Sequence, residues 1–221
     1  MTALAKSQIQ NPGFQTTGDV AVDTGREPLQ MGWYEFAAGF CQGRTALDVG
    51  CGMGEGLALL KRAASRATGI DLDPRLANES VKTLRIEDVP SKSVDIVVCI
   101  DVIEHVEEDI KFAEELMRVA RQDVFISTPN WTVSKCKWPY HIREYMPHEL
   151  QSILGRYGKL EVFKGSIDGA IHYPVNFPGA YALLNRLRVN PVTGFLARVF
   201  NRLLPMSARI QAAQFIRVRI S

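Results

Sequence analysis

The chain has 221 residues, 46% of them hydrophobic and 23% charged, and a formal net charge of +2. This length favours one well-cored domain with appendages and is short for two domains. No apolar run is long enough for a membrane span, the N-terminus has no signal-peptide pattern, and the four cysteines form no CxxC pair. We therefore expect a cytoplasmic protein with free thiols and with neither disulfides nor a metal site.

The charge is unevenly distributed along the chain. Residues 170–221 contain seven arginines and no aspartate or glutamate. Residues 1–169 contain 19 basic and 24 acidic residues, so their balance is negative. The excess of positive charge therefore lies entirely in the C-terminal part.

Strand and helix patterns alternate along most of the chain. Residues 1–30 have few hydrophobic side chains and predict a loose N-terminal arm. Helices are expected at 55–66, 107–120 and 147–158 from their apolar spacing and terminal residues. Strands are expected at 45–50, 67–74, 81–86, 93–100, 123–129, 159–167 and 212–220.

This order predicts an α/β fold of the Rossmann-like, doubly wound type. Its sheet would be mostly parallel and seven-stranded, with a helical insert before the last strand. Residues 31–169 and 212–221 would form the core, and residues 170–211 the insert. Ligands of such sheets bind at the carboxyl ends of the strands.

Glycines follow the first strand in the stretch "LDVGCGMGEG". A ligand lying against a strand-to-helix turn needs residues without a Cβ, and the turn can require positive φ. Gly50, Gly52 and Gly54 meet this need, and the next helix offers its N-terminal amides. A dinucleotide fingerprint would have glycine at position 55, where this chain has Glu55. A purely structural turn is the alternative.

Asp71 ends the second strand, 21 positions beyond Gly50. A carboxylate at this point can accept hydrogen bonds from the two hydroxyls of a ribose. The alternative is an aspartate that caps the turn after Pro74. Together with the glycine turn, Asp71 favours a nucleoside-containing cofactor.

From Gly32 to Ser166 the chain resembles the class I S-adenosylmethionine-dependent methyltransferases, in particular those of type 11. "LDVGCGMGEG", "GIDLDP", "VDIVVCIDVIEHVEED" and "VFISTPN" are similar to the motifs of the first, second, fourth and fifth strands of that family. The resemblance implies S-adenosyl-L-methionine as cofactor. The cofactor-binding residues that it implies are Asp48, Gly50, Cys51, Gly52, Gly54, Asp71, Leu72, Glu87, Asp88, Ile100 and Asp101. The stretch from Asp73 to Val81 is short for the family's second helix.

Transfer of a methyl group to a hydroxyl requires a base or a metal near the acceptor oxygen. His105 follows the fourth strand and His141 follows the fifth, so both are expected where acceptor and cofactor meet. Either is a candidate base, and a structural role in a loop is the alternative for each. His148 opens a helix and is a weaker candidate.

A narrower likeness suggests the acceptor. "TGRE" and "YHIREYMPHEL" resemble segments of methyltransferases of surface-polysaccharide and other glycan biosynthesis, although Arg26 and Glu27 stand in swapped order. Sugars suit aromatic faces and charged groups. The candidate substrate residues are Trp131, Tyr140, Arg143 and Glu144, while packing under the helix from Pro147 is the alternative for Trp138 and Tyr145.

The insert should form two short amphipathic helices with arginines beside their apolar faces. Such an insert could form a lid over the acceptor. Because it has arginines but no acidic residues, we expect a phosphorylated or lipid-linked acceptor, or peripheral contact of residues 180–210 with an anionic membrane. A solvated cationic face is the alternative, and no nucleic-acid partner is expected.

We therefore expect an O-methyltransferase acting on a sugar of a glycan or of its nucleotide- or lipid-linked precursor. Two alternatives stay open: methylation of a small metabolite such as a quinone precursor or natural product, and a cofactor-binding scaffold without catalysis.

Overall fold

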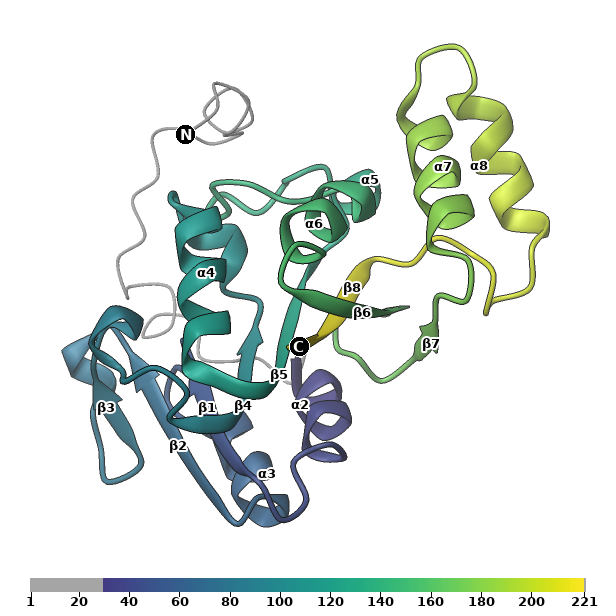
Figure 1. The fold of residues 1–221 in the computed structure, drawn as a ribbon. Helices are drawn as coiled ribbons and strands as arrows, with labels where there is room; N and C mark the ends of the chain where they lie inside the picture. Colours follow the sequence, from purple (N-terminus) through teal and green to yellow (C-terminus); the bar gives the residue numbers. More distant parts are fainter. Residues whose placement is uncertain (1–29, 221) are drawn as a thin grey trace.

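The computed structural model describes residues 30–220 as one sheet flanked by helices (Figure 1). The predicted arm, with Arg26 and Glu27, lies outside the described residues except for Gln30. The strands are β1 (Thr45–Val49), β2 (Arg66–Asp71), β3 (Val81–Thr83), β4 (Val94–Ile100), β5 (Ala120–Pro129), β6 (Gly158–Gly165), β7 (His172–Pro174) and β8 (Ala213–Ile220).

The sheet has the order β3-β2-β1-β4-β5-β8-β6-β7. β1 to β5 pair in parallel, whereas β8 pairs antiparallel with both β5 and β6, and β7 pairs antiparallel with β6. The α/β doubly wound prediction is confirmed, with one correction: the sheet has eight strands rather than seven. The additional strand is β7, whose three residues are too few to show an alternating pattern.

The helices are α2 (Met31–Ala38), α3 (Glu55–Ala63), α4 (Asp109–Val119), α5 (Trp131–Ser134), α6 (Pro147–Leu154), α7 (Pro178–Val189) and α8 (Gly194–Leu203). Single 3-10 turns are η3 (Pro74–Leu76), η4 (Ile86–Asp88) and η5 (Ile103–His105). Only η3 lies between β2 and β3, as the short segment after Asp73 predicts. The full second helix of the fold is therefore absent from the described residues between those strands.

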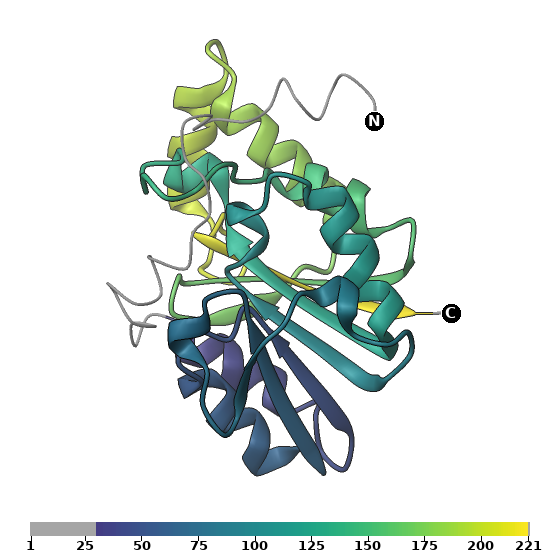
Figure 2. The same cartoon turned by 90° about the vertical axis from the view of Figure 1, so that its left-hand side faces the viewer.

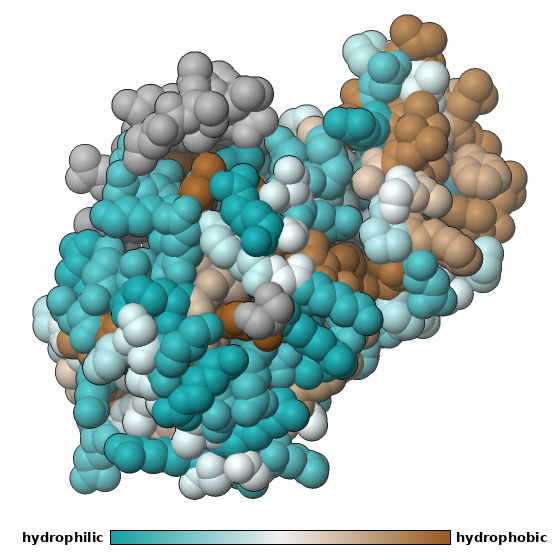
Figure 3. Space-filling model, viewed as in Figure 1, coloured by the Kyte–Doolittle hydropathy of each residue, from teal (hydrophilic) through white to brown (hydrophobic). Residues whose placement is uncertain are grey.

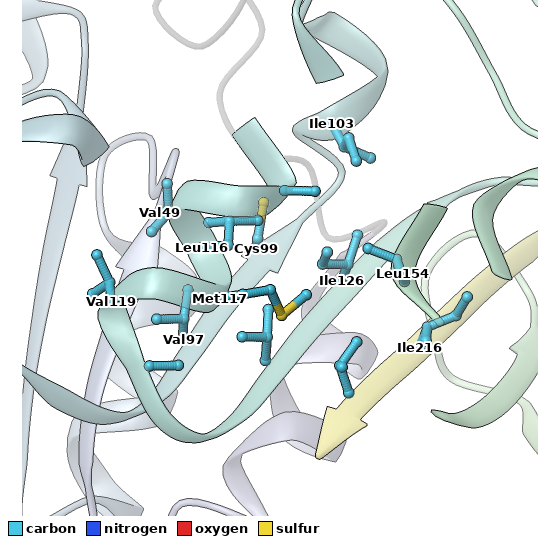
Figure 4. Close-up of a cluster of buried hydrophobic side chains, with 14 of the residues drawn as sticks. Val49, Val97, Cys99, Ile103, Leu116, Met117, Val119, Ile126, Leu154 and Ile216 are labelled. Carbon is cyan, nitrogen blue, oxygen red and sulfur yellow. The ribbon is translucent and has the colours of Figure 1, made fainter. Parts of the chain in front are cut away.

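Two apolar layers cover the two faces of the sheet. Val97 and Cys99 of β4 point toward α4, where they pack with Leu116 and Met117 (Figure 4). The alternate residues Ile96, Val98 and Ile100 belong to the layer formed with α2 and α3. This period of two explains why β4 is apolar from Ile96 to Ile100, since both faces of that stretch are buried. The turned view shows α2 and α3 opposite α4 (Figure 2).

The helices α7 and α8 form a hairpin that stands beyond the sheet in both views (Figure 1; Figure 2). We call residues 177–211 the α7–α8 hairpin. Its base is held by a buried polar contact in which Asn130 Nδ2 donates to Asn185 Oδ1 at 3.0 Å and Thr132 Oγ1 donates to the same oxygen at 2.7 Å. Within residues 30–220, no helix combines the length and apolar character that crossing a bilayer requires.

Candidate active site

The glycine turn joins β1 to α3 at the carboxyl edge of the sheet. Gly50, Gly52 and Gly54 have φ values of 69°, 58° and 95°, a region that strains residues with a side chain. A Cβ at Gly50 would lie 2.6 Å from Val102 Cγ2, so the turn packs directly against the segment after β4. The positive φ values expected for these glycines are confirmed.

Asp71 lies beside this turn at the end of β2. Its Oδ2 accepts a hydrogen bond from the Gly52 amide at 2.9 Å, and its Oδ1 accepts one from the Asp73 amide at 3.1 Å. Each carboxylate oxygen can accept a further hydrogen bond. Met53 follows Gly52 and Leu72 follows Asp71, and they expose 56% and 63% of their surface. A flat apolar ring of a bound ligand would cover these two exposed side chains.

Asp48 lies beneath the turn on β1 and is completely buried. Tyr34 of α2 donates its hydroxyl hydrogen to Asp48 Oδ1 over 3.1 Å. The Tyr34 ring requires glycine at position 56, because a Cβ there would lie 2.3 Å from the ring. Sequence reasoning missed Tyr34, which holds Asp48 from a helix outside the motif.

The segment after β4 forms the opposite wall. Ile100 is completely buried, and Asp101 has a φ of 51°. The Asp101 amide donates to the backbone oxygen of Ser127 at 3.2 Å and to its Oγ at 3.1 Å. β5 therefore fixes the left-handed turn that leads to η5.

His105 and His141 meet at this edge, with ring centroids 4.9 Å apart. His105 Nδ1 lies 2.8 Å from the backbone oxygen of Tyr140, and His141 Nδ1 lies 2.7 Å from Glu144 Oε1. Because those oxygens can only accept, we assign the hydrogen of each neutral ring to Nδ1. Each Nε2 is then the basic nitrogen. The structure thus brings together the two histidines expected near the acceptor.

Glu104 faces the same cluster from η5, with its Oε1 4.0 Å from His141 Nε2. Its side chain is fully buried, and among the described residues neither carboxylate oxygen has a hydrogen-bond partner. Burial, followed by the charge of Asp101, raises the pKa of Glu104 well above its ordinary value. Sequence reasoning missed Glu104, although it directly precedes His105.

Glu144 orients His141 rather than facing an acceptor. Its Oε2 accepts hydrogen bonds from the Ser134 hydroxyl and, at 2.9 Å, from the Cys136 amide. Burial raises the pKa of Glu144, but the hydrogen bond with His141 and the other donors outweigh this effect and leave it below its ordinary value. The expectation that Glu144 contacts the substrate is therefore corrected: its carboxylate is already bound within the protein.

Arg143 is also engaged inside the protein. Its Nη1 lies 2.6 Å from Asp109 Oδ2, which also accepts a 2.8 Å hydrogen bond from the Tyr145 hydroxyl. Arg143 is 7% exposed and Tyr145 is completely buried. Arg143 is thus wrongly predicted as a substrate residue, and Tyr145 follows the packing alternative.

The aromatic candidates lie nearer the surface. Trp131 and Tyr140 are half-buried, and the Tyr140 ring lies 5.6 Å from that of Trp138, which is 47% exposed. Tyr140 adjoins His141 in sequence and binds His105 through its backbone. Lys135 Nζ lies 4.1 Å from the centroid of the Trp131 ring.

Glu87 and Asp88 lie in the turn that follows β3. Both belong to η4, where Arg118 of α4 donates to the backbone oxygens of Ile86 and Glu87. The expected role of Glu87 and Asp88 at the cofactor stays a prediction. The amide of Leu84, just after β3, donates to the backbone oxygen of Asp71 at 3.1 Å, so the start of this turn lies beside the end of β2.

Comparison with known proteins gives a consistent result. A family model described as a methyltransferase domain matches residues 47–127. A protein of Mycolicibacterium smegmatis named "Probable S-adenosylmethionine-dependent methyltransferase" is 35% identical over 155 residues, which are 62% of this chain and 60% of that protein. A ubiquinone biosynthesis O-methyltransferase of Bordetella parapertussis is 30% identical over 124 residues, which are 47% of this chain and 50% of that protein.

Solved structures share the fold. An S-adenosylmethionine-dependent methyltransferase of Archaeoglobus fulgidus matches with a TM-score of 0.59 and 19% identity, over 91% of this chain and 97% of that one. One of Aquifex aeolicus matches with a TM-score of 0.57 and 17% identity, over 94% and 100%. The chain thus spans about half to three fifths of its curated relatives, whereas it spans nearly all of these structures.

Proposed function

Because the chain carries a class I S-adenosylmethionine-dependent methyltransferase domain, we propose that it transfers a methyl group to an acceptor hydroxyl. The cofactor supplies an electrophilic methyl on a sulfonium sulfur, which keeps the carbon–sulfur bonding electrons. The acceptor oxygen forms the new bond to carbon and loses its proton. The protein must therefore bind the donor, align the acceptor and help to remove that proton.

The observation that carries this proposal is Asp71 held beside the glycine turn. Its two oxygens are fixed by the Gly52 and Asp73 amides and retain acceptor capacity for two ribose hydroxyls. The turn of Gly50, Gly52 and Gly54 gives backbone access to the amino-acid part of the cofactor. Met53, Leu72 and the Leu84 segment would meet the adenine, while Asp48, Cys51, Ile100 and Asp101 support the turn and the opposite wall.

His141 is the better candidate for the base. Its Nδ1 hydrogen is held by Glu144, which directs Nε2 away from that carboxylate and stabilises a protonated ring. His105 is held by the backbone oxygen of Tyr140, which stabilises positive charge less. We assign Glu144 as the positioning residue and His105 as a second proton acceptor.

The α7–α8 hairpin suggests that the acceptor is carried by a lipid. Its outer face exposes Leu183, Leu187, Val192, Phe195, Leu196, Val199, Phe200, Leu203 and Met206, and this apolar face is prominent in Figure 3. Arg186, Arg198 and Arg202 are exposed among these residues, and the hairpin contains no acidic residue. This combination fits peripheral binding to an anionic membrane surface, with the hairpin as acceptor lid.

Two acceptors suit this arrangement. A lipid-linked sugar would stack on Trp131 and Tyr140, as the glycan-type likeness of the sequence suggests. A polyprenylated phenol, a quinone precursor, is the second candidate, and the relatives named ubiquinone biosynthesis O-methyltransferases favour it.

Calorimetric titration with S-adenosylmethionine, followed by transfer of a labelled methyl group to lipid-linked sugars and to polyprenyl phenols, tests the proposal. We expect donor binding and label in one acceptor class. Donor binding without transfer to any acceptor would favour the scaffold alternative, and absence of donor binding to the pure protein would contradict the proposal.

A further inference from the structure

Glu104, His105 and His141 each offer one ligand atom, and these three atoms lie within 4.8 Å of one another. From this cluster we propose a binding site for one divalent transition-metal ion at the carboxyl edge of the sheet. The site adjoins the glycine turn, because η5 follows Val102, whose side chain packs against Gly50. This replaces the expectation from sequence that the chain has no metal site.

Both histidines are oriented as metal ligands. A neutral imidazole coordinates a metal through the nitrogen that carries no hydrogen. In His105 and in His141, Nδ1 is hydrogen-bonded to an oxygen that can only accept, so the lone pair belongs to Nε2. His141 Nε2 faces Glu104 Oε1. One nitrogen of each ring and one oxygen of Glu104 lie within 4.8 Å of one another, which is close enough for a single ion to bind all three.

Glu144 supplies the outer support that such ligands usually have. A metal-bound histidine generally donates its other N–H to a carboxylate or a backbone carbonyl, which fixes the ring and raises its basicity. Glu144 does this for His141 at 2.7 Å, and the Tyr140 oxygen does it for His105 at 2.8 Å. Ser134 and Cys136 in turn hold Glu144 in place.

The carboxylate of Glu104 provides an observation independent of the histidines. It is fully buried, and neither oxygen has a hydrogen-bond partner among the described residues. Buried carboxylates are normally paired, hydrogen-bonded or bound to a metal. Asp101 and Glu144 add negative charge nearby. A cation between Glu104 and the two Nε2 atoms would provide the missing partner and offset this repulsion.

The ligand set indicates the kind of ion. Two imidazoles and one carboxylate suit Zn²⁺, Fe²⁺, Mn²⁺ or Co²⁺, whereas Mg²⁺ and Ca²⁺ prefer oxygen ligands. Three protein ligands leave coordination positions for water and an acceptor oxygen. If the proposed function is correct, on which this role rests, the ion would hold the acceptor hydroxyl and lower its pKa. The proton would then pass to water, because His141 Nε2 would bind the ion instead of accepting the proton.

The test uses the full chain without a histidine tag, freed of metal by chelation and dialysis. Co²⁺ is titrated while its visible absorption is recorded, and Zn²⁺ binding is measured by calorimetry. We expect one ion per chain. Glu144→Gln removes only the outer support and should weaken ion binding by roughly 10- to 100-fold. The ligand variants His105→Gln, His141→Gln and Glu104→Gln should each weaken it by at least as much. His172→Gln, outside the cluster, should bind as the wild type does.

Circular dichroism and S-adenosylmethionine titration of each variant show whether it is folded. Failure of the wild type to bind Co²⁺ and Zn²⁺, or equal binding by folded Glu104→Gln and His141→Gln, would overturn the site. These titrations need no acceptor, so they are independent of the proposed function. Chelator-resistant methyl transfer without ion binding would contradict the metal site alone. Ion binding at these ligands without transfer to any acceptor would support the site and contradict the function.

Discussion

At the end of β2, the carboxylate of Asp71 is held by two backbone amides on one side and can meet two hydroxyls on the other. Replacing Asp71 by alanine should weaken S-adenosylmethionine binding by about 1.5 to 3 kcal/mol, because hydrogen bonds to a charged group contribute that much. Calorimetry measures this as a roughly 10- to 150-fold rise in the dissociation constant.

Asp88→Ala is the matched control for Asp71→Ala. Asp88 is also an aspartate that follows a parallel strand, but it lies in η4, five residues beyond the end of β3. Its substitution should weaken donor binding less than that of Asp71. Equal losses in the two variants would contradict the assignment of the ribose site to Asp71.

His141→Ala should slow methyl transfer by about 10²- to 10⁴-fold, the range for general base catalysis, while donor affinity stays the same. A loss is expected whether Nε2 accepts the proton itself or holds an ion that activates the acceptor. Glu144→Gln should cost less, because the glutamine oxygen can still accept the Nδ1 hydrogen. Single-turnover transfer of a labelled methyl group measures both rates. His148→Ala serves as control, since His148 opens α6. Full activity in His141→Ala would show that this residue does not activate the acceptor.

The sequence predicts individual site residues only where a local motif carries them. Gly50, Asp71 and the two histidines follow strand ends, and parallel strands bring these ends together. Arg143 was misassigned because its partner Asp109 is 34 positions away, and nothing local reveals a buried ion pair. The sequence predicts Glu144 as a substrate residue, and only the fold shows that its carboxylate is hydrogen-bonded to His141.

The α7–α8 hairpin carries an exposed apolar face. Phe195, Leu196 and Leu203 are 67%, 69% and 78% exposed. The double substitution Leu196→Ser with Leu203→Ser should weaken binding to vesicles containing phosphatidylglycerol, because burial of a leucine side chain in the membrane contributes about 1.5 to 3 kcal/mol. Co-sedimentation measures this loss. Ile171→Ser, an exposed apolar residue outside the hairpin, should have no effect.

The arginines of the hairpin give a separate expectation. Arg198→Gln and Arg202→Gln should each reduce the preference for phosphatidylglycerol over phosphatidylcholine vesicles by about 1 kcal/mol, and added salt should reduce it in the wild type. Equal binding of the wild type to both vesicle types would rule out an anionic surface as the partner.

Secondary structure was predictable where a long pattern repeats. β4, β5 and β8 combine length with apolar runs or alternation, and their positions agree with the sequence pattern. β7 and α5 have three and four residues, so their formation depends on tertiary contacts rather than on periodicity. The short connection between β2 and β3 was predictable because the sequence has too few residues there for a full helix.

For the molecule as a whole, stability should rise with pH through Lys164. Burial lowers its pKa from 10.5 to about 8, and its Nζ lies 4.6 Å from the Tyr181 ring. Between these two values the unfolded chain binds more protons than the folded one, so raising the pH favours the folded state. Wild-type stability should increase by up to about 2 kcal/mol between pH 7.5 and 9.5 through this residue.

Urea denaturation of the wild type and of Lys164→Met at both pH values measures this contribution. The variant has no amine to bury, so it should lack the increase and be more stable than the wild type at pH 7.5. If the free energy of unfolding changed equally with pH in the two proteins, burial would not lower the pKa of the Lys164 amine.

The position of β8 has a consequence for how the chain is synthesised. β8 follows all the other described strands in the chain, yet it lies between β5 and β6 and is their shared partner. Until residues 213–220 leave the ribosome, β6 and β7 have no neighbour linking them to the parallel strands, and the exposed edge of β5 is open to pairing with other chains. Completion of the sheet must therefore wait until β8 has been synthesised, whereas β1 to β5 can assemble earlier. A nascent chain that stalls before residue 213 would expose β5 as its point of aggregation.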